Sequence, residues 1–143
     1  MTVYLFSDVF KTFKRFFNVE SMNDSHTFLY DCAFGFMPRK FEPTAEDKII
    51  YDEEEEVLEM YFVTEGIIGI GFSLIANGFL DKQYSIAKKQ SGSQIICDHY
   101  VVNQCKSQFI YMALIKDVKC FALTKKFMHE QVFPKYPEIC QKI

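Results

Sequence analysis

The sequence predicts an α+β fold in which an antiparallel, jelly-roll-like β-roll is flanked by N-terminal and C-terminal helices. Three observations predict it. Apolar residues follow a helical period at the start of the chain, short strand-like runs separated by turn signals occupy the middle, and helical signals return near the end. The chain has 143 residues, the size of one domain, and no internal repeat or low-complexity linker divides it. We therefore expect a single domain over residues 1–143, with N-terminal helices over 1–38, the β-roll over 39–123 and C-terminal helices over 124–143.

The N-terminal segment contains a stripe of large apolar side chains at the helical period: Phe6, Val9, Phe10, Phe13, Phe16 and Phe17. We expect this helix either to pack on its own domain or to dock on a partner, because so many large apolar side chains on one short helix must be buried from solvent. A second short helix is expected from Asp24 or Ser25 to about Phe36, with an inward face formed by Phe28, Leu29, Cys32 and Phe36.

The middle of the chain predicts about eight strands, bounded by Pro, Gly and Asn. The runs that predict them are Lys40–Pro43, Lys48–Tyr51, Glu59–Gly66, Ile67–Ile75, Phe79–Lys88 and, near the end of the roll, Gln108–Ala113 and Val118–Leu123. Gly66 is expected to close its strand with a turn. Asn77-Gly78 is expected to form a hairpin turn, because this pair accommodates positive φ.

Between the predicted strands, Asp52 to Glu56 form a run of five consecutive carboxylates. Calcium loops interleave their ligands with glycine and with residues that do not bind the ion, so we expect a solvent-exposed turn here and no metal site.

The end of the chain is predicted to be helical again. Thr124 is an expected N-cap, and the broad apolar face that follows it includes Phe127, Met128, Gln131 and Val132. Pro134 and Pro137 interrupt this helix, and Glu138–Ile143 would open a further helix that the end of the sequence cuts off.

Charge and composition argue against several classes of protein. The net charge is -3, without the basic excess that nucleic-acid binders need to neutralise phosphates. The longest apolar stretch, Ile67–Leu80, is interrupted by glycine and polar residues and is shorter than the ~20 residues that span a bilayer. No C-x-x-C pair occurs, so we expect free, mostly buried thiols in a reducing compartment at Cys32, Cys97, Cys105, Cys120 and Cys140.

Four segments, taken in order, carry a family resemblance. They are Met37–Pro43 with Asp47–Ile50, Met60–Gly66, Val118–Phe127 and Phe133–Glu138. Met60–Gly66 resembles the Met-Tyr-Phe-Ile-x-x-Gly strand and turn of cyclic nucleotide-binding domains, in the version attached to voltage-sensor-type potassium and cation channels. The other three resemble the family's entry strand, its last strand running into the B helix, and its Tyr-Pro-Glu between the B and C helices.

This resemblance implies a regulatory domain on the cytoplasmic side of an ion channel, which couples to gating or to subunit assembly. The implied partners are the rest of the channel polypeptide and neighbouring subunits, in a homotetramer of the full protein. We expect no nucleic-acid partner, and we expect that this segment itself does not span the membrane.

The resemblance also implies a cassette in which the nucleotide would bind. In the family, a Gly-Glu pair opens a short helix that faces the cyclic phosphate, the Glu binds the ribose 2′-hydroxyl, and an Arg before Thr-Ala or Ser-Ala pairs with the phosphate. Here Cys97-Asp98 stands in place of Gly-Glu and Tyr111-Met112-Ala113 in place of Arg-Thr-Ala, while Lys106 offers a point charge within the cassette.

These departures predict a degenerate pocket. Cysteine adds a Cβ where glycine lets the backbone approach the phosphate, aspartate is shorter than glutamate by one methylene, and Tyr111 has no guanidinium. The sequence holds only two arginines, Arg15 and Arg39, both far from the cassette in sequence. We therefore expect no bound cAMP or cGMP and no other cofactor. The alternative is a functional cAMP or cGMP sensor with a variant cassette.

An enzyme of the cupin or jelly-roll type would share the same strand pattern. Its metal ligands would be clustered histidines with a glutamate, whereas His26, His99 and His129 are isolated in this sequence. No P-loop and no nucleophile motif is present. We expect no catalytic residues and no metal.

Overall fold

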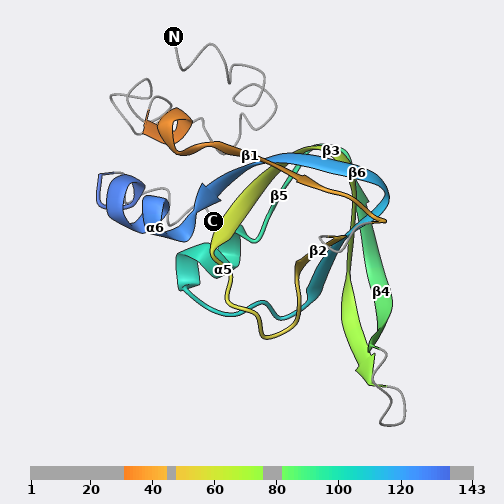
Figure 1. Ribbon diagram of the computed structural model, residues 1–143. Coiled ribbons are helices and arrows are strands. Elements are labelled where there is room, and N and C mark those ends of the chain that lie inside the picture. The colour runs from red at the N-terminus through yellow and green to blue at the C-terminus, as the bar shows by residue number, and fades with distance from the viewer. Residues whose placement is uncertain (1–30, 45–47, 76–81, 136–143) are drawn as a thin grey trace.

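An antiparallel sheet of six strands forms the centre of the computed structural model, which describes residues 31–44, 48–75 and 82–135 (Figure 1). The strands are β1 (Met37–Phe41), β2 (Ile49–Tyr51), β3 (Glu59–Ile75), β4 (Lys82–Ser91), β5 (Gln94–Ile96) and β6 (Ile110–Thr124). Hydrogen-bonded neighbours follow the order β1-β6-β3-β4, while β2 also pairs with β6 and β5 with β3. Residues 31–35 are helical, and α5 (Asp98–Asn103), α6 (Lys125–Phe127) and the π-helix η2 (Met128–Val132) complete the described elements.

The antiparallel roll with flanking helices is therefore confirmed, and the elements divide between its two ends. Figure 1 shows α5, α6 and the helical residues 31–35 at one end of the sheet, and the β3–β4 ribbon projecting at the other. The strands β3 and β4 pair from Ile67↔Ser91 to Ile75↔Lys82, as the predicted hairpin requires. The Asn77-Gly78 turn itself lies outside the described residues, as do the predicted helix over Phe6–Phe17 and the segment Glu138–Ile143.

Gly66 does not close a strand, contrary to the prediction. It has a φ of 116° and lies within the continuous strand β3, where the register against β6 shifts between Val63 and Ile67. A Cβ at Gly66 would lie 2.7 Å from the Cα of Val118 on β6. The glycine is therefore needed for the close approach of a bulged strand to its neighbour, and the strand bends there without ending.

The two strands predicted around Gln108–Ala113 and Val118–Leu123 are also one strand, β6. The interruption that the sequence suggested is a bend at Ile115, which has a φ of 66° and is 79% exposed. These two mergers turn the seven predicted runs into five strands, and β5 is the sixth strand of the described sheet. The short strand β5, which the sequence analysis missed, pairs with β3 through Tyr61↔Ile96.

The first strand also differs from its predicted bounds. It begins at Met37 and ends at Phe41, whereas the sequence favoured Lys40–Pro43. Met37 pairs with Ala122 of β6, and Pro43 lies in a turn. The start of β1 is thus set by a partner strand far away in the sequence, and the roll runs from Met37 to Thr124.

The C-terminal cap is confirmed. The Thr124 hydroxyl oxygen accepts a hydrogen bond from the backbone N–H of Phe127 at 3.0 Å, which satisfies one of the free donors at the helix start. Met128 and Val132 are fully buried, Phe127 is half-buried and Gln131 is exposed. The predicted apolar face is therefore narrower than expected.

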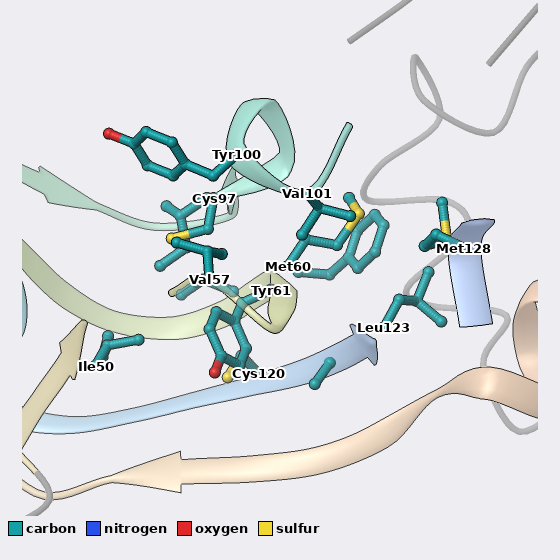
Figure 2. Packing of buried hydrophobic residues seen from close by; sticks show 14 of the residues in the cluster. Ile50, Val57, Met60, Tyr61, Cys97, Tyr100, Val101, Cys120, Leu123 and Met128 are labelled. Atoms are coloured by element: carbon teal, nitrogen blue, oxygen red, sulfur yellow. The ribbon is translucent and has the colours of Figure 1, made fainter. Parts of the chain in front are cut away.

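The core lies between the sheet and the helices at one end. The side chains of Met60, Phe62, Leu123 and Met128 are fully buried, and the rings of Phe36 and Phe62 meet edge to face with centroids 5.4 Å apart. Figure 2 shows Cys97 and Val101 on the side of α5 that faces the sheet. Within the described part of the chain, no helix is long and apolar enough to cross a membrane.

The run of carboxylates from Asp52 to Glu56 is largely exposed, as predicted, but one of its side chains binds the neighbouring strand β3. Glu54, Glu55 and Glu56 are exposed, and Glu54 has a φ of 63° in the turn. A carboxylate oxygen of Glu53 accepts hydrogen bonds from the backbone N–H and the hydroxyl of Ser73, so this residue fastens the turn to β3. Among the described residues, no group of three or more His, Cys, Asp or Glu side chains could hold a metal ion.

Candidate functional site

Cys97, the first of the predicted cassette residues, immediately precedes the helix α5. Cys97 is its N-cap, with φ 65° and ψ 9°, and its carbonyl oxygen accepts a hydrogen bond from Val101 N–H at 3.2 Å. This left-handed conformation is one that glycine adopts without strain and a cysteine does not. The Cys97 side chain is only 4% exposed, and burial raises the pKa of its thiol well above the ordinary value. The start of the helix therefore has a glycine-like backbone, with a buried neutral thiol added to it.

Asp98 follows as the first residue of α5. Its carboxylate is half-buried, and this burial raises its pKa. The backbone N–H groups of Asp98 and His99 act in the opposite direction, because they stabilise the ionised carboxylate. The amides at the start of the helix thus already interact with an acidic group of the protein itself.

Tyr111 reaches the cassette helix from β6. Its hydroxyl lies 3.1 Å from the hydroxyl of Tyr100 on α5, and the two buried rings are arranged edge to face. Burial, with a smaller effect from the Tyr100 hydrogen bond, raises the pKa of Tyr111, so this residue is neutral at physiological pH. A neutral tyrosine pair therefore lies beside the start of α5, where the resemblance would place a cation.

The structure brings four of the six predicted residues together and leaves two apart. Ala113 is buried in the same core cluster as Cys97 and Tyr111, whereas Met112 is buried outside that cluster, as alternation along β6 requires. Lys106 is exposed, and its backbone forms a bridge with Glu56 in the loop after α5. Its ammonium group is in no ion pair among the described residues.

Ser107, next to Lys106, is a polar residue that the sequence analysis missed. It is fully buried, and its hydroxyl donates to the carbonyl oxygen of Phe109 at 2.6 Å. Its backbone accepts from Glu54 N–H at 2.8 Å and donates to the Glu55 carbonyl at 2.9 Å. The acidic turn therefore holds the loop that closes the cassette. No local sequence signal marks this contact, because the two segments are far apart in the chain.

The guanidinium group of Arg39, the kind of group that would pair with a phosphate, is bound to Glu59 outside the cassette. Arg39 on β1 binds Glu59 through both oxygens, with Nη2–Oε2 at 2.9 Å and Nε–Oε1 at 3.3 Å. Tyr61 donates to the same carboxylate at 3.0 Å, and the Tyr51 hydroxyl accepts from the backbone N–H groups of Leu58 and Glu59. This network, which the sequence analysis also missed, joins the middle of β1 to the start of β3 and engages the one arginine of the described residues.

The described cysteines agree with the expectation of free, mostly buried thiols. Cys32, Cys97 and Cys120 are buried and Cys105 is exposed, and none of these four forms a disulfide. Three clefts are described on the surface, and none of them is lined by Cys97, Asp98 or Tyr111.

Comparison with known proteins identifies the fold. No family model and no curated protein matches the sequence. Among solved structures, the regulatory domain of Toxoplasma gondii PKA with cAMP superposes with a TM-score of 0.69 at 10% identity, over 94% of this chain and 47% of that one. The Thermus thermophilus catabolite activator protein has a TM-score of 0.59 at 12% identity, over 89% of this chain and 53% of that one.

A third structure is a mutant regulatory subunit of a cAMP-independent protein kinase A from Trypanosoma brucei, with cAMP in its A site. It has a TM-score of 0.66 at 11% identity, over 95% of this chain and 44% of that one. The chain thus spans about half the length of the structures it matches. Their shared architecture is the cyclic nucleotide-binding β-roll, and this is the fold of the chain. These neighbours are regulatory or activator proteins and not catalytic domains.

Proposed function

We propose that this chain is a regulatory domain that keeps the cyclic nucleotide-binding fold but fills the cassette with its own side chains. The observation that carries the proposal is the buried contact between Tyr111 and Tyr100 beside the start of α5, with hydroxyls 3.1 Å apart. At the position where the family pairs an arginine with the phosphate, this chain places a neutral hydroxyl that already has a protein partner.

Three physical effects oppose a cyclic phosphate at this place. The phosphate charge would be desolvated without a guanidinium partner, since Arg39 is bound to Glu59 and no arginine follows it in the sequence. The loss of one charged partner in a buried pair costs about 2–5 kcal/mol, or about 30-fold or more in affinity. The Asp98 side chain is one methylene shorter than the family's glutamate and reaches less far toward the ribose, and the Cys97 side chain takes up space at the helix start.

A comparison with the trypanosome protein supports the role given to the missing arginine. That regulatory subunit belongs to a cAMP-independent kinase, and the form with cAMP bound is a triple mutant in which one substitution replaces a threonine with an arginine. This is a property of that protein. For the present chain it motivates the restoring experiment described below.

The alternative is a functional sensor of cAMP or cGMP with a variant cassette. One observation favours it: Cys97 retains the left-handed backbone that a glycine would adopt at the start of α5. In this alternative the amides of α5 approach the phosphate as in the family, and a residue other than arginine supplies the positive charge.

The proposed parent protein is an ion channel, with this domain on the cytoplasmic side and in contact with neighbouring subunits of a homotetramer. The support for this is the sequence resemblance of Met60–Gly66 and the three further segments, whereas the superposed structures are kinase regulatory subunits and a catabolite activator protein. Fractionation of cells that express the complete gene tests the proposal. Recovery of the protein in the soluble fraction would refute a membrane parent.

Isothermal titration with cAMP and with cGMP tests the filled cassette. We expect no heat from the wild-type domain at ligand concentrations of tens of micromolar. The triple variant Cys97→Gly, Asp98→Glu, Tyr111→Arg restores the three family residues and is expected to bind. The matched triple variant carries Tyr111→Met in place of Tyr111→Arg, together with the same changes at Cys97 and Asp98. Methionine is of similar length but uncharged, so this variant is expected to give no heat.

Each outcome discriminates between the possibilities. Micromolar binding by the wild-type domain would overturn the proposal and support the sensor. Equal binding by the arginine and methionine variants would overturn the role assigned to the guanidinium. The absence of binding heat from both triple variants would overturn the assignment of Cys97, Asp98 and Tyr111 to a phosphate site.

A further inference from the structure

The largest described cleft lies away from the cassette and has a volume of about 620 Å³. Its lining comes from the starts of β1 and β3, from β2, from the residue after α5, and from the end of β6 with α6 and η2. In Figure 1 α5, α6, the starts of β1 and β3 and the end of β6 lie at the helical end of the sheet. A volume of this size is within the range of small-molecule sites in proteins, roughly 300–1,000 Å³.

Part of the lining of this cleft is apolar and exposed. Met37, Tyr51 and Leu58 contribute to it, and Leu58 is 53% exposed although its neighbours Val57 and Met60 are almost fully buried. The Leu58 backbone is held in place, because its carbonyl accepts a hydrogen bond from Lys125 N–H at 2.7 Å and its N–H donates to the Tyr51 hydroxyl at 3.1 Å. An exposed leucine on a fixed backbone, inside a concave surface, offers a preformed contact for an apolar ligand body.

The charges around the cleft favour an anion. Three cationic and two acidic side chains line it, in a protein whose net charge is -3. Arg39 and Glu59 bind each other through two hydrogen bonds and form a neutral unit. The remaining cations are the adjacent residues Lys125 and Lys126 on α6, and the remaining acid is Glu130.

The two lysines differ in how accessible they are to an anion. Lys125 pairs at 3.1 Å with Glu56, whose side chain is 65% exposed to solvent, so this pair is weak and Lys125 can exchange it for another anion. Lys126 is exposed and takes part in none of the ion pairs of the described residues. We therefore expect one acidic group to bind the two lysines, and we expect Glu130, which also lines the cleft, to disfavour ligands with several acidic groups.

From this geometry we propose that the cleft is a ligand site for a small organic anion with one acidic group on an apolar body. The apolar body packs on Leu58 and Met37, and the acidic group binds Lys126 and Lys125. The site shares no residue with the cassette, so its occupancy does not depend on the function proposed above. A ligand here would contact both Gln104, which follows α5, and the π-helix η2 that packs against α5 through His129.

A titration with anilinonaphthalene sulfonate, an aromatic monoanion, tests the proposal on the whole chain. Calorimetry is expected to give one site per chain, and the same probe without its sulfonate is expected to bind about tenfold more weakly. Leu58→Gln is expected to weaken binding about tenfold, while the matched variant Phe72→Gln, at an apolar residue that is 46% exposed outside the cleft, changes it less than about twofold.

The charge is tested by a second matched pair. Lys126→Glu is expected to weaken binding about tenfold, and Lys116→Glu, at an exposed lysine on β6 outside the cleft, to leave it within about twofold. Thermal melts of all variants establish that they fold. Absence of binding, several equivalent sites per chain, or equal effects within either matched pair would overturn the proposal. A neutral probe that binds as well as the sulfonate would overturn the anionic class of ligand.

Discussion

Replacement of Ile115 is expected to stabilise the protein, because the native residue is strained and gains little from packing. Ile115 has a φ of 66° and is 79% exposed. The left-handed conformation costs a β-branched residue about 1–2 kcal/mol, whereas asparagine tolerates it. Full burial of an isoleucine contributes about 1.5–3 kcal/mol, so the small buried part of this side chain contributes about 0.5 kcal/mol. Ile115→Asn is therefore expected to raise the free energy of unfolding by about 1 kcal/mol.

The ladder between β3 and β6 supports this magnitude, because it includes Leu114 and Lys119 and not Ile115. No cross-strand pair is lost on substitution. Ile115→Gly is expected to gain less, about 0–0.5 kcal/mol, since glycine also increases the conformational entropy of the unfolded chain. Urea denaturation measures both values, and a gain of about 1 kcal/mol corresponds to about 3 °C in Tm.

The neighbouring exposed residue provides the control. Lys116 has an ordinary φ, so Lys116→Asn is expected to stay within about 0.5 kcal/mol of the wild type. An Ile115→Asn variant that is less stable than the wild type, or that changes stability no more than Lys116→Asn does, would refute the argument from backbone strain.

Three further predictions concern glycines, a carboxylate and the thiols. Gly66→Ala is expected to cost about 3 kcal/mol in chemical denaturation, because its Cβ would meet the backbone of β6, whereas Gly92→Ala, also at positive φ but with nothing within 4 Å, costs about 1 kcal/mol. Since burial raises the pKa of Asp98, its ionisation destabilises the fold; Asp98→Asn is expected to be more stable than wild type at neutral pH. The free energy of unfolding of both proteins, measured over pH, should show this difference shrinking as the pH falls through the raised pKa of the folded state. The difference should vanish near pH 3.8, the ordinary pKa of the carboxyl group, and a difference that is constant with pH would contradict the prediction. In a Cys140→Ser background, a thiol reagent at mild alkaline pH is expected to modify Cys105 rapidly; fast reaction of a second thiol would contradict the burial of Cys32, Cys97 and Cys120.

The features that depend on neighbouring residues could be predicted from the sequence alone. The Thr124 cap, the hairpin pairing of β3 with β4, the strand Ile49–Tyr51 and the exposed acidic turn each follow from a few adjacent side chains and their backbone preferences. The antiparallel roll follows from the spacing of such signals. The absence of a cassette arginine is likewise a property of composition, since only Arg15 and Arg39 exist.

The features that depend on residues far apart in the chain follow only from the three-dimensional arrangement of the strands and helices. In sequence, Gly66 looks like a strand end and residues 114–117 look like a gap between two strands, but both lie within long strands because β3 and β6 bend together and continue to pair. In the same way, Glu59 engages Arg39 from 20 positions away and Tyr100 meets Tyr111 across two elements. Local signals report what a backbone can adopt at a position. Whether the chain turns or forms a bulge at that position depends on the strand that pairs with it. Which group a charged side chain or a hydroxyl binds likewise depends on the residues that the fold brings next to it.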